Sequence, residues 1–298
     1  MSYAASRLGY CSAARMTYCA KRGSWLALRI RLCRLPPIVA LCHDPEVIGK
    51  IFYVMRLIEG RIFWDAAFRE VHRNKRAAYF DATNGTIAAP HCLDQNALGL
   101  REFGRPGNSG NYFSRQVSRW STQYREDTLV ERDPDMDRLV EWLPSSIPLD
   151  DTTRIVHGDF RCDNLIFHST RPKVIAVLDW ELATLSHPLA DFAYHAMMYW
   201  IPGDIVAGLG GLDPQELGLP TEAGYVAAYC RRTEREAISD WDFYVAFNLF
   251  RLAAIFHGIK GRVLRGNAVS PQASERAANF PRLASLAGEA MDRCRSIG

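Results

Sequence analysis

The chain has 298 residues, of which 48% are apolar and 23% are charged, and this balance is typical of a globular protein with one large domain or two lobes. Its formal net charge of +3 is too small to indicate a nucleic-acid partner, and no run approaches the roughly 20 apolar residues that cross a bilayer. Eight cysteines without C-x-x-C pairs indicate neither a zinc site nor a disulfide framework, and reduced thiols favour a cytoplasmic location.

The first 35 residues follow no clean helical or strand period. From Met1 to His43 there are seven Lys or Arg residues and no Asp or Glu. An acid-free segment that contains Arg and Ser has the composition of a mitochondrial transit peptide. It lacks the apolar stretch of a secretory signal.

Secondary structure can be predicted along most of the remaining chain. Ile51–Gly60 is an apolar run that favours a strand, and Trp64–Ala89 favours helices that Gly85 and Pro90 interrupt. The glycine-rich stretch Gly104–Asn111 indicates a surface turn. Apolar spacing or capping residues predict six further helices, namely one that carries Phe113, Val117, Trp120 and Tyr124, and those at Met136–Leu143, Pro188–Trp200, Thr221–Arg232, Asp240–Arg262 and Pro281–Ser296. The aromatic stripe of the third of these favours core packing over a pocket.

Two short apolar runs in the middle of the chain predict a β-hairpin. They are Asn164–His168 and Lys173–Leu178, with a turn-rich spacer of four residues between them. If the ends of the two runs face each other across the turn, Asn164 lies opposite Val177, and Asp179 is two residues further along. An amide and a carboxylate then meet at the open end of the hairpin, within roughly 7 Å.

A third polar residue precedes the hairpin. The predicted strand Arg154–Val156 leads into His157-Gly158-Asp159, and Asp159 stands five residues before Asn164. Asn164 and Asp179 offer two oxygen ligands that suit Mg²⁺, which leaves Asp159 to address a nucleophile. Phosphoryl transfer needs this combination, and Asp-x₄-Asn followed by an Asp at a strand end outlines the catalytic loop of protein kinases.

Each of these residues also has a plain structural explanation. An Asp after Gly is usually a turn residue, Asn164 could cap a turn, and Asp179 could end a strand. The order and spacing of all three on one hairpin favour the catalytic interpretation over three separate coincidences.

The segments HGDFRCDNLIFH and VLDWELATLSHPLADFAYH resemble the aminoglycoside phosphotransferase and choline kinase-like family of small-molecule kinases. The resemblance is strongest to the branch found alone in bacteria and fused to some acyl-CoA dehydrogenases, and it extends from Pro36 to Asn267 and not before. It implies an α+β, protein-kinase-like fold of two lobes. Residues 1–35 would be an atypical N-terminal segment, residues 36–60 the rest of a truncated N-lobe with the hinge, and residues 61–298 a mainly helical C-lobe. The abrupt start at Pro36 favours a displaced start or reading frame over a transit peptide.

The resemblance also implies roles for the motif residues. Asp159 would be the catalytic carboxylate, and Arg161 would stabilise the transferring phosphate. Asn164 and Asp179 would hold Mg²⁺ and through it the nucleotide. His157 would buttress the loop.

Two further sets of residues follow from the same resemblance. Asp191 would accept hydrogen bonds from the backbone of the catalytic loop. Backbone groups of Arg56, Leu57 and Ile58 would bind the adenine of ATP.

The function implied is ATP- and Mg²⁺-dependent transfer of the γ-phosphate to a hydroxyl of a small molecule. The acceptor and the oligomeric state stay open, although the dehydrogenase-associated branch favours a hydroxy-acid or hydroxyacyl acceptor. The alternative is an inactive pseudokinase or truncated relative with weak ATP binding, because no glycine-rich hairpin or V-A-I-K-like lysine precedes the hinge. Lys21 and Lys50 are the lysines available there.

Overall fold

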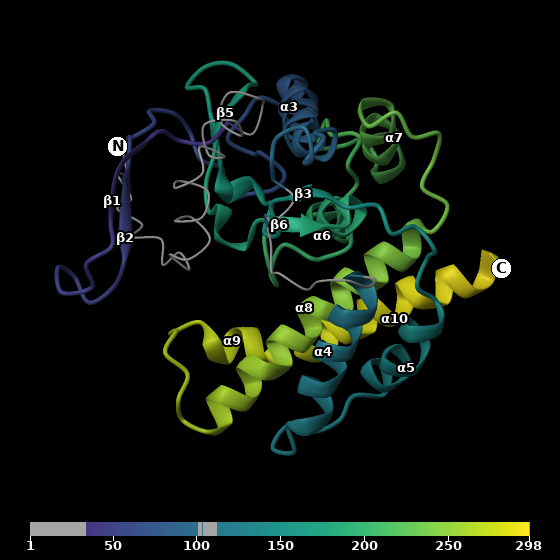
Figure 1. Ribbon diagram of the computed structural model, residues 1–298. Helices are drawn as coiled ribbons and strands as arrows, with labels where there is room; N and C mark the ends of the chain where they lie inside the picture. The colour runs from purple at the N-terminus through teal and green to yellow at the C-terminus, as the bar shows by residue number, and fades with distance from the viewer. Residues whose placement is uncertain (1–33, 101–102, 104–111, 298) are drawn as a thin grey trace.

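The computed structural model describes residues 34–100, 103 and 112–297, so the expectations for residues 1–33 and for the turn at 104–111 lie outside it. Helices dominate these residues (Figure 1). The α-helices are α3 (Arg73–His91), α4 (Tyr112–Glu126), α5 (Pro134–Trp142), α6 (Pro188–Ala196), α7 (Glu222–Arg232), α8 (Trp241–Leu264), α9 (Ala273–Ala278) and α10 (Phe280–Ile297). Short 3₁₀ turns are η1 (Leu143–Ser145), η2 (Cys162–Asn164), η3 (Trp180–Leu182) and η4 (Met197–Tyr199).

The strands form three separate antiparallel pairs. They are β1 (Ile38–Cys42) with β2 (Phe52–Met55), β3 (Arg154–Val156) with β6 (Thr184–Ser186), and β4 (Leu165–Phe167) with β5 (Val174–Val177). Figure 1 shows β1 and β2 at one side of the molecule, apart from the helices. Helices with small sheets confirm the expected α+β class. Within the described ranges, no helix is long and apolar enough to span a membrane.

Helix α3 differs from its prediction. It runs without a break through Gly85 and Pro90 and ends at His91, while residues 64–72 before it are not helical. Pro90 is tolerated because it lies in the last turn, where its missing N–H removes only one hydrogen bond. The helix then closes with the amide of Cys92 bonded to the carbonyls of Ala88 and Ala89.

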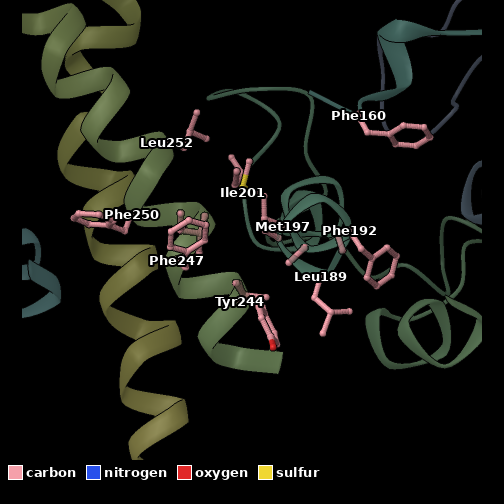
Figure 2. Packing of buried hydrophobic residues seen from close by; sticks show 14 of the residues in the cluster. Phe160, Leu189, Phe192, Met197, Ile201, Tyr244, Phe247, Phe250 and Leu252 are labelled. Carbon is pink, nitrogen blue, oxygen red and sulfur yellow. The ribbon is translucent and has the colours of Figure 1, made fainter. Parts of the chain in front are cut away.

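The core is built around α8, which buries apolar residues on all sides. Helix α10 packs along it most extensively, and α4, α6 and α9 cover other parts of its surface. Figure 2 shows Tyr244, Phe247 and Leu252 of α8 on the side of α6 and of the turn that follows it, and Phe250 on the opposite side of the helix. A helix that is apolar all round needs such complete cover. The predicted core role of the aromatic stripe in α6 holds for Phe192, which is fully buried.

The chain after β2 is fastened to the central hairpin. Arg61 and Phe167 exchange two backbone hydrogen bonds of 2.8 Å. The Phe167 ring then packs among Phe63, Phe68 and Tyr79, with ring centres 5.3–5.6 Å apart. β4 begins directly after Asn164, so this aromatic cluster fixes the strand that follows Asn164.

Gly60 tests this attachment. A Cβ at Gly60 would lie 2.4 Å from the Phe167 carbonyl oxygen and 2.5 Å from Ile166 Cγ2. We expect Gly60→Ala to lower the free energy of unfolding by about 1–3 kcal/mol, because the β4 backbone must move to admit the methyl group. Urea denaturation measures the change.

The matched control is Gly85→Ala inside α3, where the nearest atom to the new Cβ is Arg232 Nε at 3.4 Å. That variant should be as stable as the parent, or more stable by about 0.5–1 kcal/mol, because Ala favours a helix over Gly. Equal stability of the two variants would contradict the close approach at Gly60.

Candidate active site

The loop that carries the H-G-D tripeptide is held from below by helix α6. β3 pairs antiparallel with β6, so α6 begins beside the start of β3, and Asp191 in its first turn reaches the loop that follows β3. The Asp191 carboxylate accepts a hydrogen bond from the His157 amide through Oδ2 and one from the Gly158 amide through Oδ1, each of 2.8 Å. A carboxylate in the first turn of a helix is also favoured by the helix dipole.

Asp191 has a buried partner that sequence reasoning missed. His91, at the end of α3, places Nε2 3.3 Å from Asp191 Oδ2, and its Nδ1 lies 2.8 Å from the Tyr229 hydroxyl of α7. Burial alone would raise the pKa of Asp191, but the hydrogen bond and charge of His91 and the loop amide of His157 lower it below its usual value. Asp191 therefore stays ionised although it is buried.

The tripeptide itself depends on glycine. Gly158 has φ +84°, and a Cβ there would lie 2.8 Å from the Leu182 carbonyl oxygen. His157 Nε2 is 2.7 Å from the Leu178 carbonyl oxygen, and its Nδ1 accepts the Asp159 amide at 3.3 Å. His157 thus lies where a buttress would, between the loop and the strand that leads to Asp179.

The hairpin has the predicted strands but a shifted register. Leu165 pairs with Val177 and Phe167 with Val174, so one extra residue, Ile175, bulges out of β5. Asn164 is consequently opposite Leu178 and not Val177, and its carbonyl accepts the Leu178 amide at 2.8 Å. The expected facing of Asn164 and Val177 is therefore wrong by one residue, and the shift brings Asn164 nearer to Asp179.

Asp159 is held by two side chains. Its Oδ1 accepts the Tyr194 hydroxyl at 2.7 Å, and its Oδ2 lies 3.3 Å from the amide nitrogen of Asn164. The same nitrogen donates to the Asp159 carbonyl at 2.9 Å. Tyr194 belongs to the aromatic stripe of α6 that its spacing assigned to the core, so the pattern hid a contact that only the fold reveals.

The side chains of Asn164 and Asp179 fit a hard cation. Because the Asn164 amide nitrogen donates to Asp159, its oxygen is left to accept or to coordinate. Asp179 takes the left-handed conformation at φ 58°, and its side chain makes no hydrogen bond or ion pair with any residue in the described part. An amide and a carboxylate oxygen are ligands that Mg²⁺ prefers. No group of three or more His, Cys, Asp or Glu in that part could hold a metal alone, so further oxygens would come from phosphate and water.

Glu181 adds a third carboxylate to those of Asp159 and Asp179. Burial and then the negative charges of Asp179 and Asp159 raise the pKa of Glu181. Glu181 lies on η3, two residues after Asp179, and sequence reasoning did not single it out. The site is therefore strongly negative at the end where a cation would bind.

Arg161 is engaged with a neighbour. Its Nε lies 3.0 Å from Asp163 Oδ1, and its Nη2 makes a second, short contact with Asp163 Oδ2. Burial would lower the pKa of Arg161, but Asp163 raises it above its usual value. Part of the guanidinium charge that was expected to serve the phosphate is thus matched by Asp163.

In the segment expected to be the hinge, one of the backbone groups expected to bind adenine already has a partner. The Arg56 amide donates to the Pro37 carbonyl at 2.8 Å, so this N–H is occupied. Leu57 is 77% exposed, and the backbone groups of Leu57 and Ile58 have no hydrogen-bond partner among the described residues. Those two residues keep groups that could bind a base.

A cavity of about 370 Å³ opens beside the loop that carries the H-G-D tripeptide. Figure 2 shows four of its lining residues, Phe160 from the loop, Met197 and Ile201 after α6, and Leu252 from α8. Its polar lining includes the Arg161–Asp163 pair, Tyr194 and, from α9, Arg276.

The Arg276 side chain has no hydrogen bond or ion pair within the described ranges. The wall is therefore mainly apolar, with one cation whose charge is not matched. Asp159, Asn164 and Asp179 do not line it.

Solved structures of other proteins have a similar fold. A crystal structure of a Ralstonia eutropha protein classed as an aminoglycoside phosphotransferase has a TM-score of 0.83 and 43% identity, covering 92% of this chain and 83% of that one. An aminoglycoside phosphotransferase in ternary complex with ADP and hygromycin B has a TM-score of 0.57 at 12% identity, covering 89% and 81%, which is a likeness in fold alone. The expected protein-kinase-like fold is confirmed.

Two animal proteins match in sequence. Acyl-CoA dehydrogenase family member 10 of Mus musculus is 40% identical over 245 residues, which are 81% of this chain and 22% of that protein. Family member 11 of Gallus gallus is 40% identical over 248 residues, which are 81% of this chain and 31% of that protein. The expected kinship with the dehydrogenase-fused branch is confirmed, and the chain spans less than a third of the length of these relatives.

The model of the phosphotransferase enzyme family matches residues 13–244. The match begins before Pro36, so the expectation that the resemblance is absent from the earlier residues is wrong. A family model sums weak preferences at many positions, and residues 13–35 contain no motif that can be read alone. Fold, sequence relatives and family model agree, and the chain belongs to the phosphotransferase enzyme family.

Proposed function

We propose that this protein transfers the γ-phosphate of ATP to a hydroxyl group of a small molecule, with Mg²⁺ bound by Asn164 and Asp179. The observation that carries the proposal is that Asp159, Asn164 and Asp179 come together at one end of a hairpin. The side-chain amide of Asn164 donates to the Asp159 carbonyl oxygen. The backbone carbonyl of Asn164 accepts the backbone amide of Leu178, the residue before Asp179. The fold neighbour that contains ADP and hygromycin B supports a nucleotide and a hydroxylated acceptor as the two substrates.

Asp159 would orient the acceptor and take its proton. The acceptor oxygen bonds to the γ-phosphorus, the bond from that phosphorus to the bridging oxygen breaks, and ADP leaves with the electron pair. The hydroxyl proton passes to the Asp159 carboxylate late in the step, because a loose transition state needs little early base strength. Bound Mg²⁺ would neutralise charge on the phosphates.

The cavity beside the loop indicates the chemistry of the acceptor. Its apolar wall suits a hydrocarbon body, and Arg276 suits an anionic end group such as a carboxylate. Polycationic acceptors would meet an unmatched arginine and a single acidic residue, Asp163, that is already paired. We therefore favour a hydroxy acid or a related anionic hydroxyl compound.

The alternative is an inactive pseudokinase or truncated family member that binds ATP weakly. Strands β1 and β2 carry no lysine, and Lys50 lies in an exposed turn between them. Lys21 lies outside the described residues. Without a lysine on the α- and β-phosphates, binding loses roughly 1.5–3 kcal/mol, or about 10- to 150-fold in affinity.

Substitution of Asp159 by Asn tests the catalytic role. We expect Asp159→Asn to lower kcat by about 100-fold or more, since the amide cannot accept the proton. The melting temperature should change little, because Asp159 is half-buried at the loop surface and the amide keeps its shape. Steady-state assays of ADP release with an added hydroxy acid measure the effect, and turnover equal to the parent would place the chemistry elsewhere.

Isothermal titration with Mg-ATP tests the nucleotide site. We expect affinity in the millimolar range, reduced further in Asp179→Asn because a charged metal ligand is lost. Omitting Mg²⁺ should weaken binding to the parent but not to the variant. Micromolar affinity that disappears in Lys21→Ala would contradict the expected weakness and assign the phosphate contact to that lysine.

Arg276 tests the acceptor class. Arg276→Met should raise KM for a short-chain hydroxy acid about 10-fold, because a charge-assisted contact is lost, although the position is exposed. KM for Mg-ATP and for a neutral alcohol of the same length should not change. Arg231→Met, at an exposed position in the last turn of α7 and outside the cavity, is the control. A rise in both acceptor KM values would show that Arg276 shapes the cavity without binding an anion.

A further inference from the structure

Helix α6 contacts the catalytic loop through two side chains one turn apart. Asp191 accepts the amides of His157 and Gly158, and Tyr194, three residues later, donates its hydroxyl to Asp159 Oδ1 at 2.7 Å. Residues at this spacing lie on one face of a helix. The same face of α6 therefore sets both the backbone of the loop and the carboxylate that it carries.

Arg251 of α8 holds Tyr194 from the other side. Its guanidinium carbon lies 5.0 Å from the centre of the Tyr194 ring, and its Nη2 is 3.3 Å from the Gly158 carbonyl oxygen. A cation over an aromatic face is attracted to the ring, and this contact limits the movement of the phenol. Arg251 thus joins Tyr194 to the loop residue that precedes Asp159.

Tyr194 is suited to act as a donor. Burial, followed by the negative charge of Asp159, raises the pKa of the Tyr194 phenol above its usual value, so the phenol stays protonated. Tyr194 also lines the cavity beside the loop. It is the side chain that joins the cavity wall to the carboxylate.

We propose that Tyr194, held by Arg251, is a positioning residue that fixes the orientation of the Asp159 carboxylate. The inference rests on the proposed phosphotransfer for its kinetic consequence, but the contact itself is independent of turnover. With Tyr194 on Oδ1 and Asn164 on Oδ2, the carboxylate cannot rotate freely, and an acceptor hydroxyl meets it in one arrangement. Loss of the phenol would free that rotation while leaving the nucleotide site in place.

The variant that tests this is Tyr194→Phe, which removes only the hydroxyl and keeps the ring under Arg251. The matched control is Tyr199→Phe. Tyr199 lies on η4, donates to the Pro220 carbonyl at 3.0 Å and does not line the cavity. Both changes delete one phenolic hydrogen bond, and only the first touches the loop.

We expect Tyr194→Phe to lower kcat about 10- to 100-fold, because a misdirected carboxylate loses near-attack geometry. KM for Mg-ATP should stay within about twofold of the parent, because the hydroxyl contacts neither metal ligand. The ratio of ATP hydrolysed to acceptor phosphorylated should rise, because a freely rotating carboxylate can also activate water. Tyr199→Phe should leave kcat and the ratio unchanged, with a similar shift in melting temperature. An equal kcat in the two variants, or a parallel loss of kcat and of Mg-ATP binding, would overturn the proposal.

Hydrogen exchange of a peptide covering residues 157–164 separates this inference from the proposed function. Faster exchange in Tyr194→Phe than in Tyr199→Phe, measured without ligands, would support the contact whether or not the parent is active. A parent that neither binds Mg-ATP nor transfers phosphate would refute the proposed function alone. Identical exchange in both variants would overturn the inference even in an active enzyme.

Discussion

The structure depends on one buried carboxylate. Asp191 satisfies two loop amides that would otherwise be buried without partners, and removing such an acceptor costs more than the hydrogen bonds themselves contribute. Its charge is stabilised by His91 from α3, which is itself fixed by Tyr229 from α7. Three helices far apart in sequence therefore determine the backbone of a loop of five residues. The geometry of the loop is a property of the helical body.

The β3–β6 and β4–β5 pairs together position the polar groups of the site. β3 leads into the loop and its partner β6 leads into α6, which carries Asp191, while the β4–β5 pair brings Asn164 and Asp179 to one end of the hairpin. His157 links the pairs, because it belongs to the loop and bonds the Leu178 carbonyl at the end of β5. The polar groups are thus brought together by side-chain and loop hydrogen bonds across two sheets, with no continuous sheet beneath them.

Local features of the site could be predicted from the sequence, and distant ones could not. The spacing of Asp159 and Asn164 and the short hairpin place three polar residues together because few residues separate them. The bulge at Ile175 escaped prediction, since run lengths do not reveal one unpaired residue. Tyr194 looked like core because helical spacing reports which face is buried and not which hydroxyl finds a partner. His91, Arg251 and Arg276 reach the site only through the packing of α3, α8 and α9.

The cavity wall and the groups proposed for phosphate chemistry share only part of the chain. The loop and α6 contribute one side of the wall, through Phe160, Arg161, Asp163 and Tyr194, while the segment before α3, α3 itself, the turn after α6, α8 and α9 supply the rest. Substitutions in this remaining part of the wall can therefore accumulate without disturbing the loop. In evolutionary terms this arrangement would let descendants of one ancestor exchange one alcohol for another while inheriting the proposed transfer step, and it makes that part of the wall the region where divergence in specificity should be sought.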